Sequence, residues 1–127
     1  MIVVDASCAV LGLLNDGQAR RRLSDGAVAV PHLIDAEVAH ALRGQVRRGS
    51  ITPGDGHQAL SHWARLAVQR FALVWLLDRM WELRENLSAY DAAYVSLAES
   101  MDCELVTADA RISRAPGPTC SITIVRR

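Results

Sequence analysis

The sequence predicts one α/β domain of three layers, with a mostly parallel central sheet flanked by helices on both faces. Three observations predict this fold class. Short runs rich in β-branched residues recur along the chain, and stretches with helical spacing of apolar residues separate them. The runs are apolar at consecutive positions, which is typical of strands buried on both faces. The 127 residues contain no internal repeat or linker, so we expect a single domain over residues 1–127.

The first half of the chain alternates strand and helix signals. The expected elements are, in order, a strand over 2–4, a helix over 7–14 with Ser7 as its N-cap, a helix over 16–25, a strand over 27–30 and a helix over 33–48. Gly26 and Gly49 follow two of these helices, where glycine commonly ends a helix. Pro31 closes the second strand.

The second half opens with Thr52, Pro53 and Asp55, the pattern of a capped helix start. Helical spacing of apolar residues then continues to Phe71. The segment 71–77 fits a strand and a helix equally well. The remaining expected elements are helices over 78–85 and 88–101 and strands over 104–106 and 122–125. The expected sheet therefore has four strands.

The composition excludes several classes of protein. Fourteen basic residues, all of them Arg, balance fourteen acidic ones, so any nucleic-acid binding must rest on local patches. Arg without Lys leans toward phosphate binding, although a coding bias explains it better. The three cysteines, Cys8, Cys103 and Cys120, have no C-x-x-C spacing, which indicates reduced thiols rather than a disulfide framework or a zinc site. No apolar run reaches the roughly 20 residues that cross a bilayer, so we expect a soluble cytoplasmic protein without membrane partners.

Four carboxylates stand where a charge is unusual. Asp5 ends the first strand, and Asp109 follows the strand over 104–106, so in a parallel sheet both lie at the same edge. Glu37 borders the apolar stripe of its helix, and Asp91 opens a helix with apolar neighbours on its own face. Four converging acids repel one another, and a hard divalent cation removes that repulsion. The expected ion is Mg²⁺, for which Mn²⁺ substitutes.

Each acid also has a purely structural interpretation. Asp5 is able to cap the next helix, and Asp91 forms a capping-box pattern with Ser88. Asp109 fits a turn into a helix, and Glu37 fits an ordinary exposed position. Spacing alone does not decide between the two interpretations.

Four segments, 2–10, 33–42, 87–99 and 104–112, together resemble the PIN domain, and especially the VapC toxins of VapBC toxin–antitoxin systems. The first reads Asp-Ala-Ser at residues 5–7, the second carries Glu37, the third reads Tyr-Asp-Ala-Ala-Tyr at 90–94, and the fourth reads Thr-Ala-Asp at 107–109. The segments occur in the family order and, with the intervening helices, cover nearly the whole chain. The resemblance implies a PIN-like three-layer fold and a metal-dependent ribonuclease toxin that hydrolyses RNA.

The resemblance also implies roles for individual residues. Asp5, Asp91 and Asp109 bind the cation, and Glu37 either coordinates it or orients a water. Ser7 and Thr107 hold a water or the metal, or cap helices; the two interpretations stay open. One residue departs from the family pattern: His40 stands where Asn is common. It either contacts a phosphate or a metal-bound water, or faces solvent.

Partners follow from the same resemblance: an RNA substrate, a VapB-like antitoxin and a second copy of the chain. Candidate phosphate contacts are Arg43, Arg47, Arg48, Arg111 and Arg114. Candidate partner contacts are Leu11, Leu13 and Leu14, or Trp63 and Trp75, although Trp at helical spacing is more often part of a core.

The sequence fits other functions less well. The main alternative is a catalytically weak or inactive PIN-like domain that binds protein or RNA. A response-regulator domain is disfavoured because a second acid after the first strand and a Lys after the last are both missing. A haloacid-dehalogenase-type phosphatase requires Asp-x-Asp, and the chain has Ser7 at the second position. No pattern for a Ser or Cys nucleophile is present. The target RNA, the identity of the antitoxin and the number of metal ions are not readable from the sequence.

Overall fold

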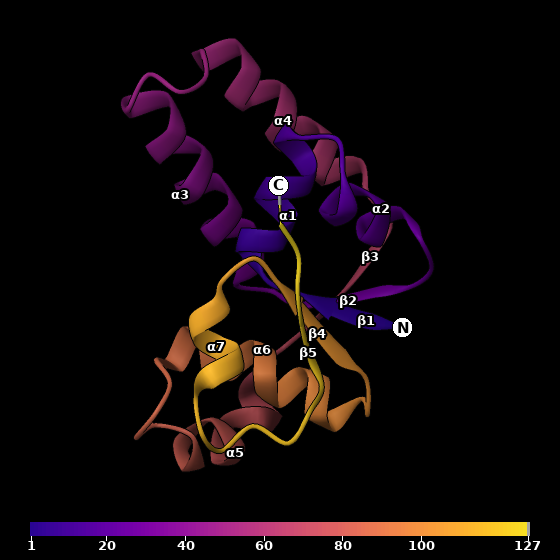
Figure 1. Cartoon of the computed structure of the whole chain (residues 1–127), viewed down its shortest axis with the longest axis vertical. Coiled ribbons are helices and arrows are strands. Elements are labelled where there is room, and N and C mark those ends of the chain that lie inside the picture. The colour runs from indigo at the N-terminus through magenta and orange to yellow at the C-terminus, as the bar shows by residue number, and fades with distance from the viewer. Residues whose placement is uncertain (127) are drawn as a thin grey trace.

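Five parallel strands form the centre of the computed structural model, which describes residues 1–126 (Figure 1). They are β1 (Ile2–Val4), β2 (Val28–Pro31), β3 (Val68–Phe71), β4 (Glu104–Thr107) and β5 (Ile122–Ile124), in the spatial order β3-β2-β1-β4-β5. Every neighbouring pair is parallel, with Ile2 opposite both Val28 and Glu104 in register. The predicted fold class is confirmed, and the sheet is wholly parallel.

Helices cover both faces of this sheet. They are α1 (Ala6–Leu14), α2 (Gln18–Ser24), α3 (Ile34–Arg47), α4 (Pro53–Arg65), the 3₁₀ turn η1 (Val74–Leu76), α5 (Leu77–Glu82), α6 (Ala89–Ser100) and α7 (Ala110–Arg114). Helices α1–α4 lie on one side and α5–α7 on the other (Figure 1). Right-handed crossovers explain the division, because the chain moves outward from β1 to β3 and then returns past β1 to β4 and β5.

The core lies where the sheet meets these helices. Val3, Val4, Val30, Leu105 and Val106 are fully buried, because β1, β2 and β4 are covered on both faces. This burial explains why the strands read as continuous apolar runs rather than as alternating ones.

The prediction of a helix as far as Phe71 was wrong. Helix α4 ends at Arg65, Leu66 is extended, and Val68–Phe71 forms the edge strand β3 against β2. Pairing with an open edge of the sheet outweighs the helical spacing of this segment. The open segment 71–77 forms the end of β3, a 3₁₀ turn and the start of α5. The sheet therefore has five strands instead of four.

The first helix is capped differently from the prediction. Its N-cap is Asp5, whose side chain accepts from the backbone N–H of Cys8, and Ser7 lies inside the first turn. Because β1 ends at Val4, no residue separates the strand from the cap. The expected cap at Thr52, with Asp55 completing a capping box, and the cap at Ser88 are both confirmed.

The three cysteines are free thiols, as expected from their spacing. Burial raises the pKa of the Cys8 thiol to about 12. No helix within residues 1–126 is long and apolar enough to cross a membrane.

Candidate active site

The strand order reverses beside β1, and the candidate carboxylates gather at that point. From β1 the chain builds outward through β2 and β3, and it then returns to place β4 on the other flank of β1. Asp5 directly follows β1, and Asp109 follows β4 by two residues. In open parallel sheets the crevice outside the carboxyl ends of strands at such a reversal is the usual place for a ligand.

Asp5 is the most buried acid of this group, with 5% of its surface exposed. Its Oδ1 accepts from Ser7 Oγ at 2.7 Å and from the Cys8 N–H at 3.0 Å, and Thr107 Oγ1 donates to Oδ2. Burial raises the pKa of Asp5, and the charge of Asp91 acts in the same direction, whereas the hydrogen bonds oppose it. A buried, well-oriented carboxylate is thus held next to a second acid.

Ser7 and Thr107 tie the ends of β1 and β4 together around this carboxylate. Each hydroxyl donates its one proton to Asp5 and accepts from a backbone N–H: Ser7 Oγ from Ala108 and Thr107 Oγ1 from Asp109, both at 3.0 Å. With their protons committed to Asp5, the hydroxyls position the carboxylate. Neither one is the cap of α1, so the capping interpretation of Ser7 is wrong.

Glu37 reaches the same edge from α3, on the opposite side of the sheet from α6. Its Oε1 accepts a hydrogen bond from the hydroxyl of Tyr94, a residue of α6 that is 2% exposed. Burial raises the pKa of Glu37, and the negative charges of Asp5 and Asp91 raise it further. Tyr94 had no predicted role beyond its place in the motif, and only the fold shows that it orients Glu37.

Asp91 and Asp109 complete the group from the other helix layer. Asp91 stands in the first turn of α6, and its N–H donates to Ser88 Oγ at 3.1 Å, while its carboxylate is half-buried. Burial raises the pKa of Asp91, and the charge of Asp109 adds to the increase. Asp109 caps α7 and forms a two-bond ion pair with Arg111, which lowers its pKa.

The donor set fits a hard divalent cation in its chemistry. Three of the acids have raised pKa values because they are desolvated near like charges, and positive charge at this edge relieves both penalties. In the described part of the chain, however, no three His, Cys, Asp or Glu side chains stand close enough to form a complete ligand set. Both carboxylate oxygens of Asp109 are turned to Arg111 instead.

The other candidates from the sequence lie around this group. His40 is exposed on α3, three residues beyond Glu37. Arg43, Arg47 and Arg48 are exposed along the same helix, and across residues 1–126 they form no ion pair. They are therefore available to an incoming polyanion, whereas Arg111 is already bound to Asp109.

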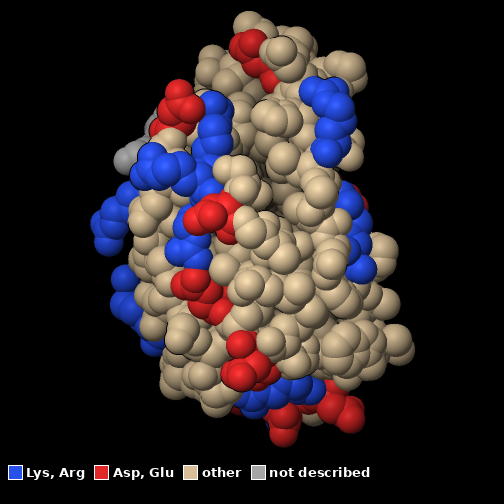
Figure 2. Space-filling view, turned by 90° about the vertical axis from the view of Figure 1, so that its right-hand side faces the viewer, with Lys and Arg blue, Asp and Glu red and all other residues tan. Residues whose placement is uncertain are grey.

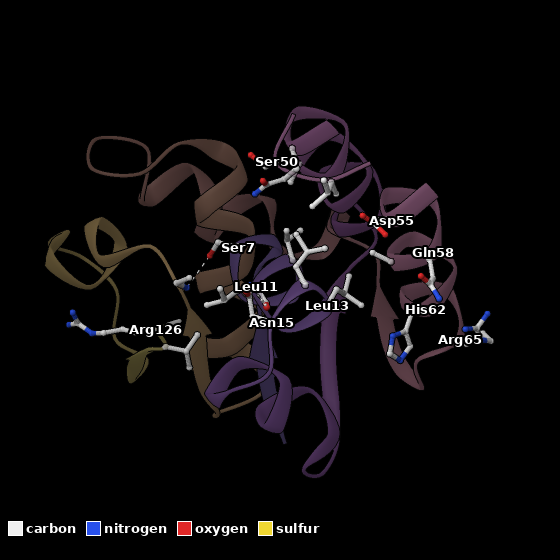
Figure 3. Close-up of a pocket in the computed structure, with 18 residues that line it drawn as sticks. Ser7, Leu11, Leu13, Asn15, Ser50, Asp55, Gln58, His62, Arg65 and Arg126 are labelled. Atoms are coloured by element: carbon white, nitrogen blue, oxygen red, sulfur yellow. Dashed lines mark hydrogen bonds between the residues drawn. The ribbon is translucent and has the colours of Figure 1, made fainter. Parts of the chain in front are cut away.

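A groove of about 1150 Å³ lies between α1 and the hairpin of α3 and α4 (Figure 3). Ser7 and Ala108 line one end, beside Asp5. Leu11, Leu14 and Ile51 contribute apolar surface; the polar lining residues include Gln45, Asp55, Gln58, His62, Arg65 and Arg126. All three predicted apolar contacts of the first helix, Leu11, Leu13 and Leu14, thus line the groove.

The surface charge is local rather than global. Figure 2 shows blue and red side chains interspersed along one side of the molecule, next to a broad area of uncharged residues. This distribution agrees with the zero formal net charge and with a dependence on local patches.

Comparison with known proteins identifies the family and related folds. The family model for the PIN domain matches residues 2–118. The chain is 53% identical over 127 residues to ribonuclease VapC9 of Mycobacterium tuberculosis, which covers all of both chains. It is 39% identical to ribonuclease VapC1 of the same organism, over 98% of this chain and 97% of that one. Among solved structures, VapBC2 of Rickettsia felis, bound to a DNA fragment from its promoter, has a TM-score of 0.70 at 16% identity, covering 99% of this chain and all of that one.

Proposed function

This chain belongs to the PIN-domain family, among the VapC ribonucleases of toxin–antitoxin systems, and we propose that it hydrolyses RNA with a divalent cation held by Asp5, Glu37, Asp91 and Asp109. One observation carries the metal dependence. Four carboxylates, placed after β1, in α3, in α6 and after β4, lie toward the strand reversal, and three of them have raised pKa values. Like charges held in partly buried positions lower stability, and a bound cation would relieve this cost, which supports the proposal.

The residues have separate roles in this proposal. Asp5, Asp91 and Asp109 would hold Mg²⁺ or Mn²⁺, which lowers the pKa of a bound water and polarises a phosphoryl oxygen when present. Glu37, held by Tyr94, either completes the ligand set or takes up a proton from water at its free Oε2. Ser7 and Thr107 fix the orientation of Asp5, so its oxygens need no rearrangement during the reaction.

RNA would approach along the exposed side of α3. Arg43, Arg47 and Arg48 supply positive charge there, and Arg side chains bind phosphate oxygens in bidentate geometry. Because these contacts are made to the phosphate backbone, they would contribute affinity for any RNA. Selection of a target would depend on the shape of the RNA. We place the activity in the cytoplasm, where RNA is available.

The direct test is cleavage of purified cellular RNA by the antitoxin-free protein. We expect discrete fragments with Mg²⁺ or Mn²⁺ and complete loss of cleavage with excess chelator, restored when the cation is returned. The ends of the fragments would identify the target. Absence of cleavage by folded, cation-saturated protein would favour the alternative, a PIN-like domain that binds RNA or protein without cutting.

We further propose that the groove between α1 and the α3–α4 hairpin binds a peptide segment of a VapB-like antitoxin. Its apolar surface suits the side chains of an amphipathic segment, and Arg65, Arg126 and Asp55 offer charged partners at its rim. The end beside Ser7 lies next to Asp5, so a bound peptide would reach the acidic group and exclude RNA.

The groove leads to a specific prediction. Leu14→Arg places a charge on its apolar surface and is expected to weaken binding of the cognate antitoxin by about 100-fold. Cleavage by the free toxin should persist, because Leu14 lies on α1 away from the carboxylates. Titration calorimetry with the antitoxin measures the effect, with Asn86→Arg, at an exposed position between α5 and α6, as the control. Unchanged affinity in Leu14→Arg would place the antitoxin elsewhere.

The homodimer expected from the resemblance stays a prediction. We expect its interface among the exposed apolar side chains of η1 and α5, which are Val74, Trp75, Leu77 and Trp81. Trp75 is thus a candidate partner contact, as the sequence suggested, whereas Trp63 is 2% exposed and belongs to the core.

A further inference from the structure

Arg111 lies at the mouth of the acidic group and is held there by one residue. Its Nε donates to Asp109 Oδ1 at 3.1 Å and its Nη2 to Oδ2 at 2.8 Å. The side chain of Arg111 is 82% exposed, whereas that of Asp109 is 25% exposed. The guanidinium of Arg111 is therefore exposed to solvent, while two of its N–H groups bind the less exposed carboxylate of Asp109.

The positive charge of Arg111 extends beyond Asp109. It also opposes the rise in the pKa of Asp91, so it acts on both acids of this half of the site. The side chain thus supplies, from solvent, part of the compensation that a cation supplies when bound. A carboxylate whose two oxygens are bound to a guanidinium is not free to coordinate a metal as well.

Such an ion pair is weak enough to exchange. Exposed Arg–carboxylate pairs contribute about 1 kcal/mol or less, because water screens them and holding two side chains in place reduces their entropy. A divalent cation that gains two or three carboxylate ligands therefore displaces the guanidinium readily. The backbone bond from the Arg111 N–H to Asp109 Oδ1, at 2.9 Å, keeps α7 capped or is replaced by solvent when this happens.

We propose that Arg111 is an exchangeable counter-ion: it neutralises Asp109 in the cation-free protein, gives up Asp109 when the cation binds, and then contacts the phosphate next to the scissile bond. The inference rests on the proposed function and adds a residue to it. The released guanidinium stays tethered two residues from Asp109 and keeps the planar fork that suits phosphate oxygens. Arg111 is thus a competitor of the cation and a partner of the substrate.

The two roles have opposite consequences in one variant. Arg111→Ala removes the competitor, so Mn²⁺ should bind about 2- to 5-fold more tightly. It also removes a phosphate contact, so kcat/KM for RNA at saturating Mn²⁺ should fall by about 10- to 100-fold. Loss of a residue that only supported the fold would weaken both Mn²⁺ binding and RNA cleavage.

Arg114 provides the matched control for cation binding. It belongs to the same short helix as Arg111, and its replacement by Ala removes the same charge. Within the described residues no hydrogen bond joins it to Asp109. Arg114→Ala should change Mn²⁺ affinity by less than about 2-fold, because a screened charge without a direct contact has little effect. Circular dichroism melting curves confirm that both variants fold.

Calorimetric titration of Mn²⁺ into the RNA-free proteins tests the first role, and cleavage kinetics test the second. Movement of the Arg111 Nε–Hε NMR resonance during Mg²⁺ titration reports the release directly. Tighter Mn²⁺ binding with reduced cleavage supports the proposal. Unchanged or weaker Mn²⁺ binding in Arg111→Ala overturns the counter-ion role, and undiminished cleavage overturns the phosphate role. If wild-type protein binds no Mn²⁺, the proposed metal-dependent function itself fails.

Discussion

Asp5→Asn is expected to reduce RNA cleavage by about 10²- to 10³-fold while the protein stays folded. Asn keeps the size of the side chain and accepts a hydrogen bond from one of the two hydroxyls, but it removes the negative charge at the centre of the site. Cation binding should weaken together with cleavage, because the buried oxygen donor with the most fixed orientation is lost. Initial rates with Mg²⁺ or Mn²⁺ at a common RNA concentration measure the effect.

The control for Asp5→Asn is Asp25→Asn, which removes an equal charge from an exposed position beyond α2. Its cleavage rate should match that of the wild type. A melting temperature close to that of the wild type is required of Asp5→Asn before its rate is interpreted. Full activity in folded Asp5→Asn would remove the acidic group from the mechanism.

Trp63→Ala is expected to give the largest loss of stability, about 3–5 kcal/mol of the free energy of unfolding. The indole is 2% exposed on α4, its Nε1 donates to Asp35 Oδ1 at 2.8 Å, and the Arg70 guanidinium lies 5.9 Å from the centre of the ring. Arg70 in β3 also forms a bidentate pair with Asp35 in α3. The residue therefore joins α3, α4 and the edge strand, and its loss leaves a cavity and removes one of the two hydrogen bonds that Asp35 Oδ1 accepts.

Two further variants separate the contributions of Trp63. Trp63→Phe keeps most of the apolar volume and loses the hydrogen bond, so it should lower stability by about 1–2 kcal/mol. Trp81→Ala removes an indole that is 68% exposed and whose ring centre lies 4.5 Å from the Arg84 guanidinium, so its effect on the stability of the monomer should stay within about 0.5 kcal/mol. Urea unfolding curves measure all three. Equal losses in Trp63→Ala and Trp81→Ala would show that burial does not determine the effect.

Much of the fold was predictable because the signals are local. The buried strands, the caps at Thr52 and Ser88 and the helix over 34–47 follow from short stretches of sequence. The edge strand β3 was missed because its residues continue a helical spacing, and its pairing with β2 is a contact between distant segments. The cap of α1 was assigned to Ser7 because the sequence does not show that β1 ends at Val4 and that the next residue, Asp5, caps the helix.

The site was predictable as a set of acids and not as an arrangement. Motifs and the resemblance named Asp5, Glu37, Asp91 and Asp109, but no pattern indicates which hydroxyl or guanidinium each one contacts. The Tyr94–Glu37 bond joins helices on opposite sides of the sheet, 57 residues apart. The bond of Arg111 to Asp109 was not predictable for another reason. The side chains of residues two apart in sequence adopt many relative orientations, and the sequence alone suggested that Arg111 contacts a phosphate.

The position of β1 between β2 and β4 has a consequence for folding during synthesis on the ribosome. Thr107 binds Asp5 across a separation of 102 residues, so this contact forms only after nearly all of the chain has been synthesised. Until β4 emerges, β1 has a partner on one flank only, and the carboxylate of Asp5 lacks its second hydroxyl. Pairings between strands that are distant in sequence form late in folding, together with the rest of the domain. A nascent or truncated chain therefore lacks the assembled acidic group, and the proposed cleavage would arise only in the fully folded domain.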